Sequence, residues 1–334
     1  MLTAVKENDS SYEEKTTDYD GLWKDLIEEL FREFMQYFAP DLYPEINFEK
    51  GVTSVDKELH QLSINSKKGR KYPDKVVKTA MKNGGEKYIL VHIEVQAIGK
   101  EEFAKRMFKY FYRVYDKYSD FDIYAIALLT DAKHKNHADK YNYSFYGTAL
   151  TYKYNTFKFH EKDIGELKQS SNPFSIAVLA GIYASKSAGK SENENGKRYN
   201  FKKELVNLAY EKYDHHETYL SALLYFIDFI LKIPPEWNAK LYASLPLALK
   251  KKEEGKLMGM EKLKDTPTFG RLYRDWKAEG VEEGKREGRR EGKKEAEKNF
   301  ARKLLERNFS DEEITQLTEL KIEEVKRLRE SLDN

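Results

Sequence analysis

Residues 72–96 constrain the fold more than any other part of the sequence, because they predict two strands joined by a tight turn. Asn83 and Gly84 mark the turn, since Asn-Gly is the strongest short signal for a β-hairpin. Tyr, Ile and Val dominate the run from 87 to 96, which is typical of a strand. The chain is therefore expected to contain an antiparallel strand pair in this region.

Two acidic residues lie in this predicted hairpin, one in each strand. Asp74 opens the first strand, whereas Glu94 and Gln96 share one face of the second, because residues two apart point to the same side. Two carboxylates held close together can bind a divalent metal ion that activates water. The alternative is an amphipathic hairpin whose acidic side chains are simply solvated, as most charged side chains are.

The letters around these acids resemble the signature of the PD-(D/E)XK nucleases. The motif PD at 73–74 is followed by EVQ at 94–96 and then by RMFKY at 106–110 within a predicted helix. This combination resembles the recombination-promoting nuclease (transposase-like) family, and the resemblance covers roughly residues 20–165. The chain departs from the general superfamily at Gln96, which stands where a lysine is usual, so one cation is missing.

The resemblance implies a metal-dependent DNA endonuclease with a restriction-endonuclease-like mixed sheet flanked by helices. On this interpretation Asp74 and Glu94 bind Mg²⁺ or Mn²⁺ together with the main-chain carbonyl of Val95. Gln96 orients the attacking water or the phosphate, because an amide can donate and accept hydrogen bonds but carries no charge. DNA is the implied substrate, cleaved at its phosphodiester bonds during recombination or transposition.

The helix predicted from Phe103 to Tyr118 carries a second candidate surface. Arg106, Tyr110, Arg113 and Lys117 recur at spacings of 4, 3 and 4 and so share one stripe. Such a row can hold phosphates by charge and lay the tyrosine against a sugar or base. The alternative is an exposed helix face with ordinary packing of arginine stems.

An acid of the first predicted helix is a further candidate for the metal site. Glu28, Glu29 and Glu33 all lie in the helix predicted from Gly21 to Phe38. The residues leave the choice among them open, and an ordinary charged helix face is the alternative.

Composition restricts the class of protein. The chain has 334 residues, 35% of them charged, and no cysteine, which excludes disulfides and thiolate metal sites. It has no apolar run long enough for a membrane span and no signal-peptide layout, so we predict a cytoplasmic protein without a membrane partner. The formal net charge is only +2, so DNA contacts must come from local basic patches.

The order of the remaining predicted elements indicates an α/β sandwich followed by helices. A buried strand is predicted at 122–130 and a further strand within 144–159. Helices are predicted at 175–186, 201–213, 218–231 and 237–245, with a polar linker at 187–200. The predicted domains are a flexible N-terminus at 1–18, a nuclease-like domain at 19–170, an all-helical region at 171–255, a linker with a Gly-rich charged helix at 256–298, and a small helix-turn-helix-like unit at 299–334.

Glycine recurs at every fourth position in the charged segment 277–298. Each glycine inside a helix costs about 0.5–1 kcal/mol relative to alanine, and opposite charges three residues apart recover only part of this. A homo-oligomer or a partner helix packed on the glycines would supply the remainder. The segment also resembles the Gly-rich segment of the flagellar assembly protein H, which implies partner binding; a semi-flexible charged tether is the alternative.

The last predicted unit begins its second helix with a capping box. Ser310 is followed three residues later by Glu313, the spacing that lets each side chain bond the other's main-chain N–H. Lys321 to Leu332 would be the recognition helix, but it carries Glu323, Glu324 and Glu330, which oppose DNA contact. A structural or dimerising role is therefore favoured over base reading.

Overall fold

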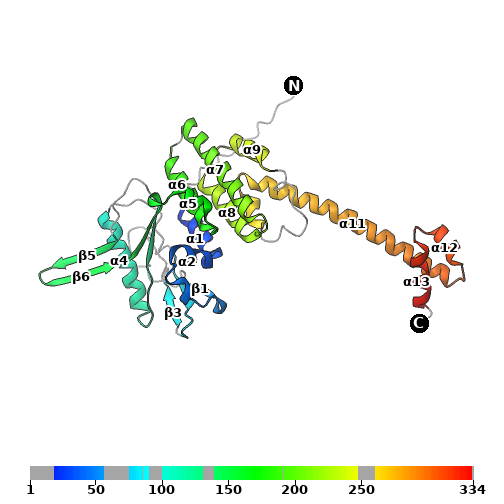
Figure 1. Cartoon of the computed structure of the whole chain (residues 1–334), viewed down its shortest axis with the longest axis horizontal. Coiled ribbons are helices and arrows are strands. Elements are labelled where there is room, and N and C mark those ends of the chain that lie inside the picture. The colour runs from blue at the N-terminus through cyan, green and yellow to red at the C-terminus, as the bar shows by residue number, and fades with distance from the viewer. Residues whose placement is uncertain are drawn as a thin grey trace, which may run out of the picture.

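Helices form a central body, with strands at one end and one long helix projecting from the other (Figure 1). The computed structural model describes residues 19–55, 75–84, 86–89, 100–130, 139–189, 191–246 and 260–332. The predicted N-terminal segment 1–18 and the residues Asp74, Glu94, Val95 and Gln96 lie outside these ranges. Within them, no helix combines the length and apolarity needed to cross a lipid bilayer.

The first predicted helix is two helices, α1 (Tyr19–Glu29) and α2 (Phe31–Phe38). The chain turns at Leu30, whose φ of −118° and ψ of 41° are not helical. The main-chain bond from Leu30 N–H to Leu26 O is kept at 3.0 Å, so the two helices remain joined end to end. Trp23 in α1 and Phe34 in α2 are both fully buried, because the turn lets each helix place its own apolar stripe on one core.

The Asn83-Gly84 hairpin is confirmed. β1 (Val52–Ser54), β2 (Val77–Ala80) and β3 (Glu86–Ile89) form an antiparallel sheet in that order. Gly84 sits between β2 and β3 at φ 87°, a conformation that favours glycine because it has no Cβ.

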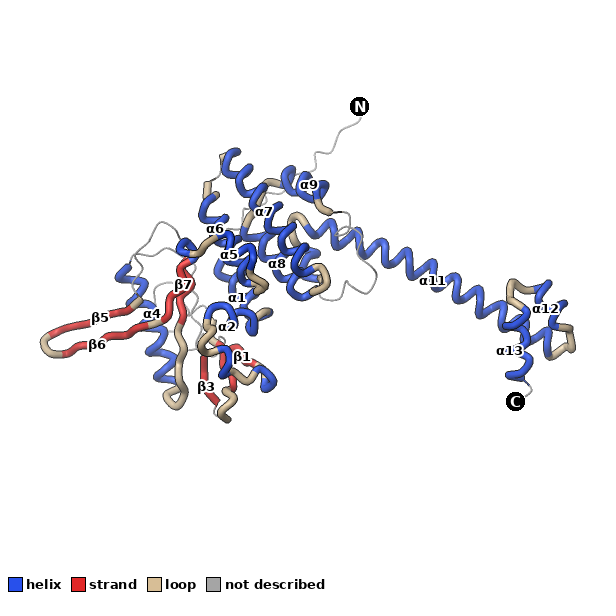
Figure 2. The backbone as a smooth tube through the Cα atoms, viewed as in Figure 1, coloured by secondary structure: helices blue, strands red, loops and turns tan. Residues whose placement is uncertain are grey.

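The other strands form two further sheets within the described residues. β4 (Ile126–Leu129) pairs in parallel with β7 (Asn155–Lys158), whereas β5 (Lys140–Phe145) and β6 (Thr148–Lys153) form an antiparallel hairpin (Figure 2). The α/β class with both strand directions is confirmed. The single mixed sheet expected from sequence is three sheets in the part of the chain that the structure describes.

Strands β2 and β4 separate two hydrophobic cores. Ile126 and Leu128 belong to the larger core of α1, α2 and the later helices, whereas Ala127 and Leu129 belong to the core under α4 (Lys100–Lys117). β4 is thus buried on both faces, which explains its continuous apolar run. The layers run from α4 through these strands to the helical body, so the strands form the middle of a sandwich.

The central helical body is built around α6 (Phe174–Lys186), whose residues 174–183 are all buried. Such a helix must be apolar on every side. It packs against α2, α5, α7 and α8, so the ranges 19–170 and 171–255 share one hydrophobic core. The helices that complete this region are α5 (Ile164–Gln169), α7 (Glu192–Tyr213), α8 (Glu217–Ile230) and α9 (Pro235–Ser244).

The polar linker predicted at 187–200 is wrong over most of its length, because α7 begins at Glu192. Ser191 caps this helix by accepting the N–H of Glu194 at 3.3 Å. Glu194 also pairs with Lys197 at 2.8 Å, and Tyr199 is buried against Trp237. Serine, asparagine and glycine are thus compatible with this helix because a cap and a tertiary contact support them.

Three tyrosines in this body predict a loss of stability at alkaline pH. Burial, assisted by nearby acids or phenols, raises the pKa of Tyr37, Tyr213 and Tyr219 to about 12. Unfolded phenols ionise near pH 10, so between pH 10 and 12 the unfolded chain binds fewer protons than the folded one. Their contribution is complete below pH 10 and falls as the pH rises through 12. Denaturant unfolding at pH 9.5, 10.5 and 11.5 measures this.

Tyr213→Phe is the matched variant, since it keeps the ring and removes the titrating hydroxyl. Its free energy of unfolding should decline less steeply with pH than that of the native chain. Parallel slopes would contradict the assignment to Tyr213.

Among the described residues, the long helix α11 (Phe269–Leu305) is buried against other elements at its two ends. Phe269, Leu272 and Trp276 are buried against the body, whereas nearly all described side chains of 277–298 are exposed. At the far end α11 packs with α12 (Asp311–Leu317) and α13 (Ile322–Leu332). The segment between is a bare helical arm, extending away from the body in Figure 1.

The C-terminal unit is a cluster of three helix segments, as expected. Ala301, Leu304 and Leu305 of α11 share a small core with Ile314 and Val325. The capping box is confirmed: the Ser310 main-chain N–H donates to Glu313 at 2.9 Å and the Ser310 hydroxyl accepts the Glu313 N–H at 3.3 Å. The unit therefore begins with the end of α11 itself.

Candidate functional site

The first candidate site is the end of the β1–β2–β3 sheet where the chain leads to the predicted carboxylates. β2 begins three residues after Asp74, and β3 ends five residues before Glu94. Val77 lies opposite Ile89 and Ala80 opposite Glu86, so the strands pair without a bulge over the described ladder. Asp74, Glu94, Val95 and Gln96 themselves lie outside the described residues.

Lys75, the neighbour of Asp74 in the chain, occupies a defined position at this edge. Its side chain is buried, and its ammonium donates to Glu28 Oε2 at 2.6 Å and to Ser54 Oγ at 3.2 Å. Glu28 comes from α1 and Ser54 from β1, so helix and sheet meet at the residue that follows Asp74. Sequence reasoning missed the role of Lys75, because the two residues of the pair are 47 positions apart and no local pattern links them.

The other acids of the first helices are engaged elsewhere. Glu29 pairs with Lys262, and Glu33 accepts a hydrogen bond from the Tyr219 hydroxyl at 2.6 Å. Both partners belong to the helical body and not to the sheet. Of the three candidate acids, Glu28 is therefore the one that contacts Lys75, the residue that follows Asp74 in the chain.

Helix α4 brings its predicted residues into three different environments. Phe103, Met107 and Val114 recur at helical spacing and are buried in the core under α4. Arg113 is exposed and Arg106 is half-buried, with its guanidinium 5.9 Å from the Phe103 ring.

Tyr110 is 4% exposed, so it packs in the interior and offers no face to a sugar or base. The stacking role expected of Tyr110 is therefore wrong. Tyr110 is three residues after the buried Met107 and four before the buried Val114, so it lies on the same side of α4. A tyrosine ring is apolar enough to pack with them.

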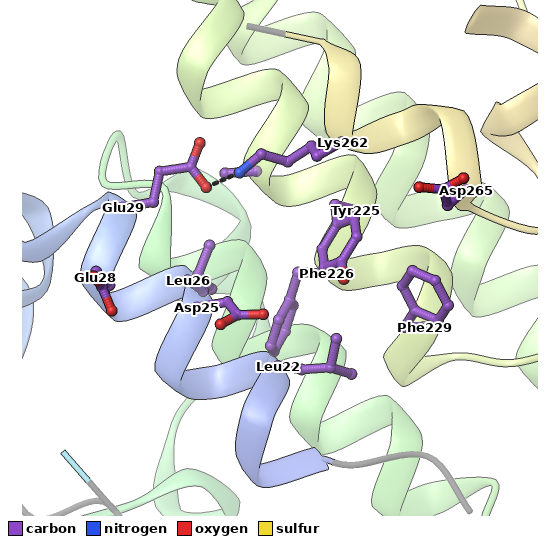
Figure 3. A pocket seen from close by; sticks show the side chains of 11 residues that line it. Leu22, Asp25, Leu26, Glu28, Glu29, Tyr225, Phe226, Phe229, Lys262 and Asp265 are labelled. Atoms are coloured by element: carbon purple, nitrogen blue, oxygen red, sulfur yellow. Dashed lines mark hydrogen bonds and ion pairs between the residues drawn. The ribbon is translucent and has the colours of Figure 1, made fainter. Parts of the chain in front are cut away.

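A cavity of about 600 Å³ opens between α1, α8 and the short helix η4 (Glu261–Asp265). Figure 3 shows Glu29 joined to Lys262 across its mouth, with Tyr225, Phe226 and Phe229 on the α8 side. Asp25, Glu28 and Asp265 add carboxylates to the wall. Burial, and then the charges of Asp25 and Asp265, raise the pKa of the Tyr225 phenol.

This cavity is unsuited to a phosphodiester, because four carboxylates face a single ammonium around it. Its residues come from segments about two hundred positions apart, so no local sequence pattern could have indicated it. Within the described ranges, no group of three His, Asp or Glu side chains gathers in the manner of a metal site.

Comparisons with known proteins found no counterpart: no family model matches the chain, and neither the curated proteins nor the solved structures include a match.

Proposed function

We propose that this chain is a metal-dependent DNA endonuclease of the PD-(D/E)XK type, resembling the recombination-promoting nuclease (transposase-like) family. One observation carries the proposal: the hairpin between the PD and EVQ motifs is an antiparallel ladder with a defined register. Support also comes from α4, which follows the EVQ motif and packs its RMFKY segment against the strand layer.

The proposal requires that the two strands keep the register of Val77 and Ile89 as far as the predicted carboxylates. Each step moves the two strands in opposite directions, so Asp74 would stand opposite position 92. Side chains two residues apart share a face, which would put Glu94 diagonally across from Asp74, about 5–8 Å away between Cβ atoms. Both carboxylates would then reach one ion.

The residues of this site have separate roles. Asp74, Glu94 and the Val95 carbonyl would hold Mg²⁺ or Mn²⁺, which when bound supplies a water of lowered pKa and polarises the phosphodiester. Gln96 would orient the water or the phosphate by hydrogen bonds. Arg113, exposed on α4, would hold the DNA strand by charge, whereas the Nε and Nη2 atoms of Arg106 are buried.

Lys75 follows Asp74 in the chain, but adjacent residues of a strand point to opposite faces, so Lys75 does not supply the cation that Gln96 lacks. Its ammonium is held between Glu28 and Ser54.

Nicking of supercoiled plasmid with Mg²⁺ or Mn²⁺, compared between the native chain and Asp74→Ala, tests the proposal. Equal nicking by both proteins would remove it.

A second candidate function is non-catalytic: a nuclease-fold protein that binds DNA or protein and docks a partner on its Gly-rich arm. The observation in its favour is the space beside α11. A Cβ placed on Gly288 or Gly292 meets no atom within 4 Å, so within the described chain nothing covers this face. Close approach of a second helix is the use that glycine at this spacing permits.

Gly288→Ala with Gly292→Ala tests the arm. Each alanine should stabilise the free helix by about 0.5–1 kcal/mol, so amide exchange in α11 should slow about two- to fivefold per substitution. If a second copy packs on the glycines, the added methyl groups should weaken self-association even though they stabilise the helix. Sedimentation velocity measures the self-association.

Arg290→Ala, on the opposite side of the helix, is the matched control and should leave self-association unchanged. Unaltered sedimentation of the double glycine variant would count against this face as the site of self-association.

A further inference from the structure

The β5–β6 hairpin reaches outward from the strand end of the molecule as an isolated ribbon (Figures 1 and 2). Its base is fastened to α4: Tyr141 stacks on Phe108 with centroids 5.1 Å apart, and Tyr152 lies 4.6 Å from Phe111. Tyr152 is buried, whereas five of the six β5 residues are exposed. A two-stranded ribbon is barely stable alone in water, so the anchored base supports a free tip.

The tip of the β5–β6 hairpin exposes aromatic side chains to solvent. Phe145 is 61% exposed and Tyr146 93%, and their rings meet edge to face at 4.8 Å. Tyr143 and Leu150, which pair across the ribbon, are also exposed. An apolar group of this kind on an isolated projection is typical of a binding surface.

The turn itself is made with an unfavourable residue. Tyr146 has φ 39° and is followed by Gly147 at φ 83°, so both central residues are left-handed. Asn, Asp or Gly adopt this conformation easily, whereas a bulky side chain there is a strained exception. A residue that is both strained and solvent-exposed indicates a function for its ring.

Charge identifies the kind of partner. Residues 140–153 contain Lys140 and Lys153 and no acidic residue. The neighbouring helix α4 exposes Lys105, Lys109, Arg113 and Lys117, opposed among its described side chains by Asp116 alone. Aromatic rings combined with an excess of positive charge are the equipment of proteins that bind single-stranded nucleic acid, by stacking on bases and neutralising phosphates.

We propose that the β5–β6 tip binds DNA at unpaired bases, with Phe145 and Tyr146 stacking on them and the lysines contacting phosphates. The proposal rests on the proposed function for DNA as the substrate, and it assigns that substrate a second point of contact away from Asp74. Bases in a duplex are stacked on each other, so a stacking tip favours single strands.

The test is fluorescence anisotropy with a labelled 20-nucleotide single strand and the matching duplex, in EDTA so that no cleavage occurs. The variant is Phe145→Thr with Tyr146→Asn, which suits a strand and a left-handed turn and so keeps the hairpin folded. We expect binding of the single strand to weaken at least fivefold, and duplex binding to change less than twofold.

Two further variants complete the design. Phe300→Ala removes a similarly exposed ring from α11 and should leave affinity unchanged. Lys140→Gln with Lys153→Gln should lower the slope of log affinity against log salt by about 1.4, since each phosphate contact on a single strand contributes about 0.7.

Several results would overturn the proposal. One is that the native chain does not bind the single strand. Another is that the tip variant binds it with the same affinity as the native chain. A third is that the native chain is a dimer and the tip variant is a monomer with unchanged DNA affinity. The last would assign the tip to a second copy of the chain. A native chain that binds through the tip but never nicks DNA would remove the endonuclease alone.

Discussion

Asp74→Ala is expected to abolish Mg²⁺-dependent nicking by this chain. A metal held by only two carboxylates and one carbonyl cannot lose a charged ligand without losing affinity and position. An ion bound there would contribute several kcal/mol of transition-state stabilisation, and a loss of about 4 kcal/mol would lower the rate about a thousandfold. The rate of conversion of supercoiled to open-circular plasmid measures the effect.

The controls separate chemistry from folding. Glu94→Gln should cause a loss of similar size, because it removes the second carboxylate while keeping the shape of the side chain. Glu306→Ala, which removes an exposed acid at the end of α11, should nick at the native rate. Thermal unfolding of each variant should stay close to that of the native chain, and nicking that survives both Asp74→Ala and Glu94→Gln would rule out this site.

Lys202→Met is expected to destabilise the protein by about 3–5 kcal/mol, the usual cost of leaving a buried charge without its partner. Lys202 of α7 and Asp228 of α8 are both fully buried and form an ion pair. Burial lowers the pKa of the Lys202 ammonium, and the Asp228 carboxylate opposes that shift. Urea unfolding followed by circular dichroism measures the free energy.

The Lys202–Asp228 pair also anchors the start of α11. The second oxygen of Asp228 accepts the main-chain N–H of Thr268 at 2.8 Å, directly before α11, where an anion is favoured by the helix N-terminus. The Thr268 hydroxyl donates to Asn238 at 2.8 Å, so α8, α9 and α11 meet at one buried polar cluster. Loss of Lys202 should therefore loosen the first turns of α11 more than its far end.

Two variants make the comparison sharp. Lys203→Met changes the adjacent, partly exposed lysine and should cost less than about 1 kcal/mol. Lys202→Met combined with Asp228→Asn removes both charges but keeps an acceptor for Thr268, and it should regain much of the loss. Native stability in Lys202→Met alone would show that the pair carries no net stabilisation.

Local chemistry explains which elements could be predicted. Asn83-Gly84 specifies a hairpin because glycine accepts the turn conformation without strain. Ser310 with Glu313 specifies a helix start because each side chain bonds the main-chain N–H of the other. Phe103, Met107 and Val114 recur at helical spacing and form the buried face of α4. Each of these signals lies within about a dozen residues.

The mistaken predictions share a different physical origin. The start of α7 is polar, so its composition resembles a loop, and only a cap and the distant Trp237 make it helical. Tyr110 is compatible with exposure or burial, and the packing of α4 on the strands chose burial. The Tyr146-Gly147 turn lacks the usual turn residues, so the sequence predicts one strand within 144–159, where the structure has the end of β5, then β6 and β7.

The sequence by itself determined the strand and helix periods, the main turn, the caps and the set of acids and amide that resemble a nuclease site. Only the tertiary structure decided that Glu28 reaches Lys75, that Lys202 and Asp228 bury together under α11, and that the β5–β6 tip stands free. The reason is that periods and turns depend on neighbours along the chain, whereas burial and ion pairing depend on segments that meet only after folding.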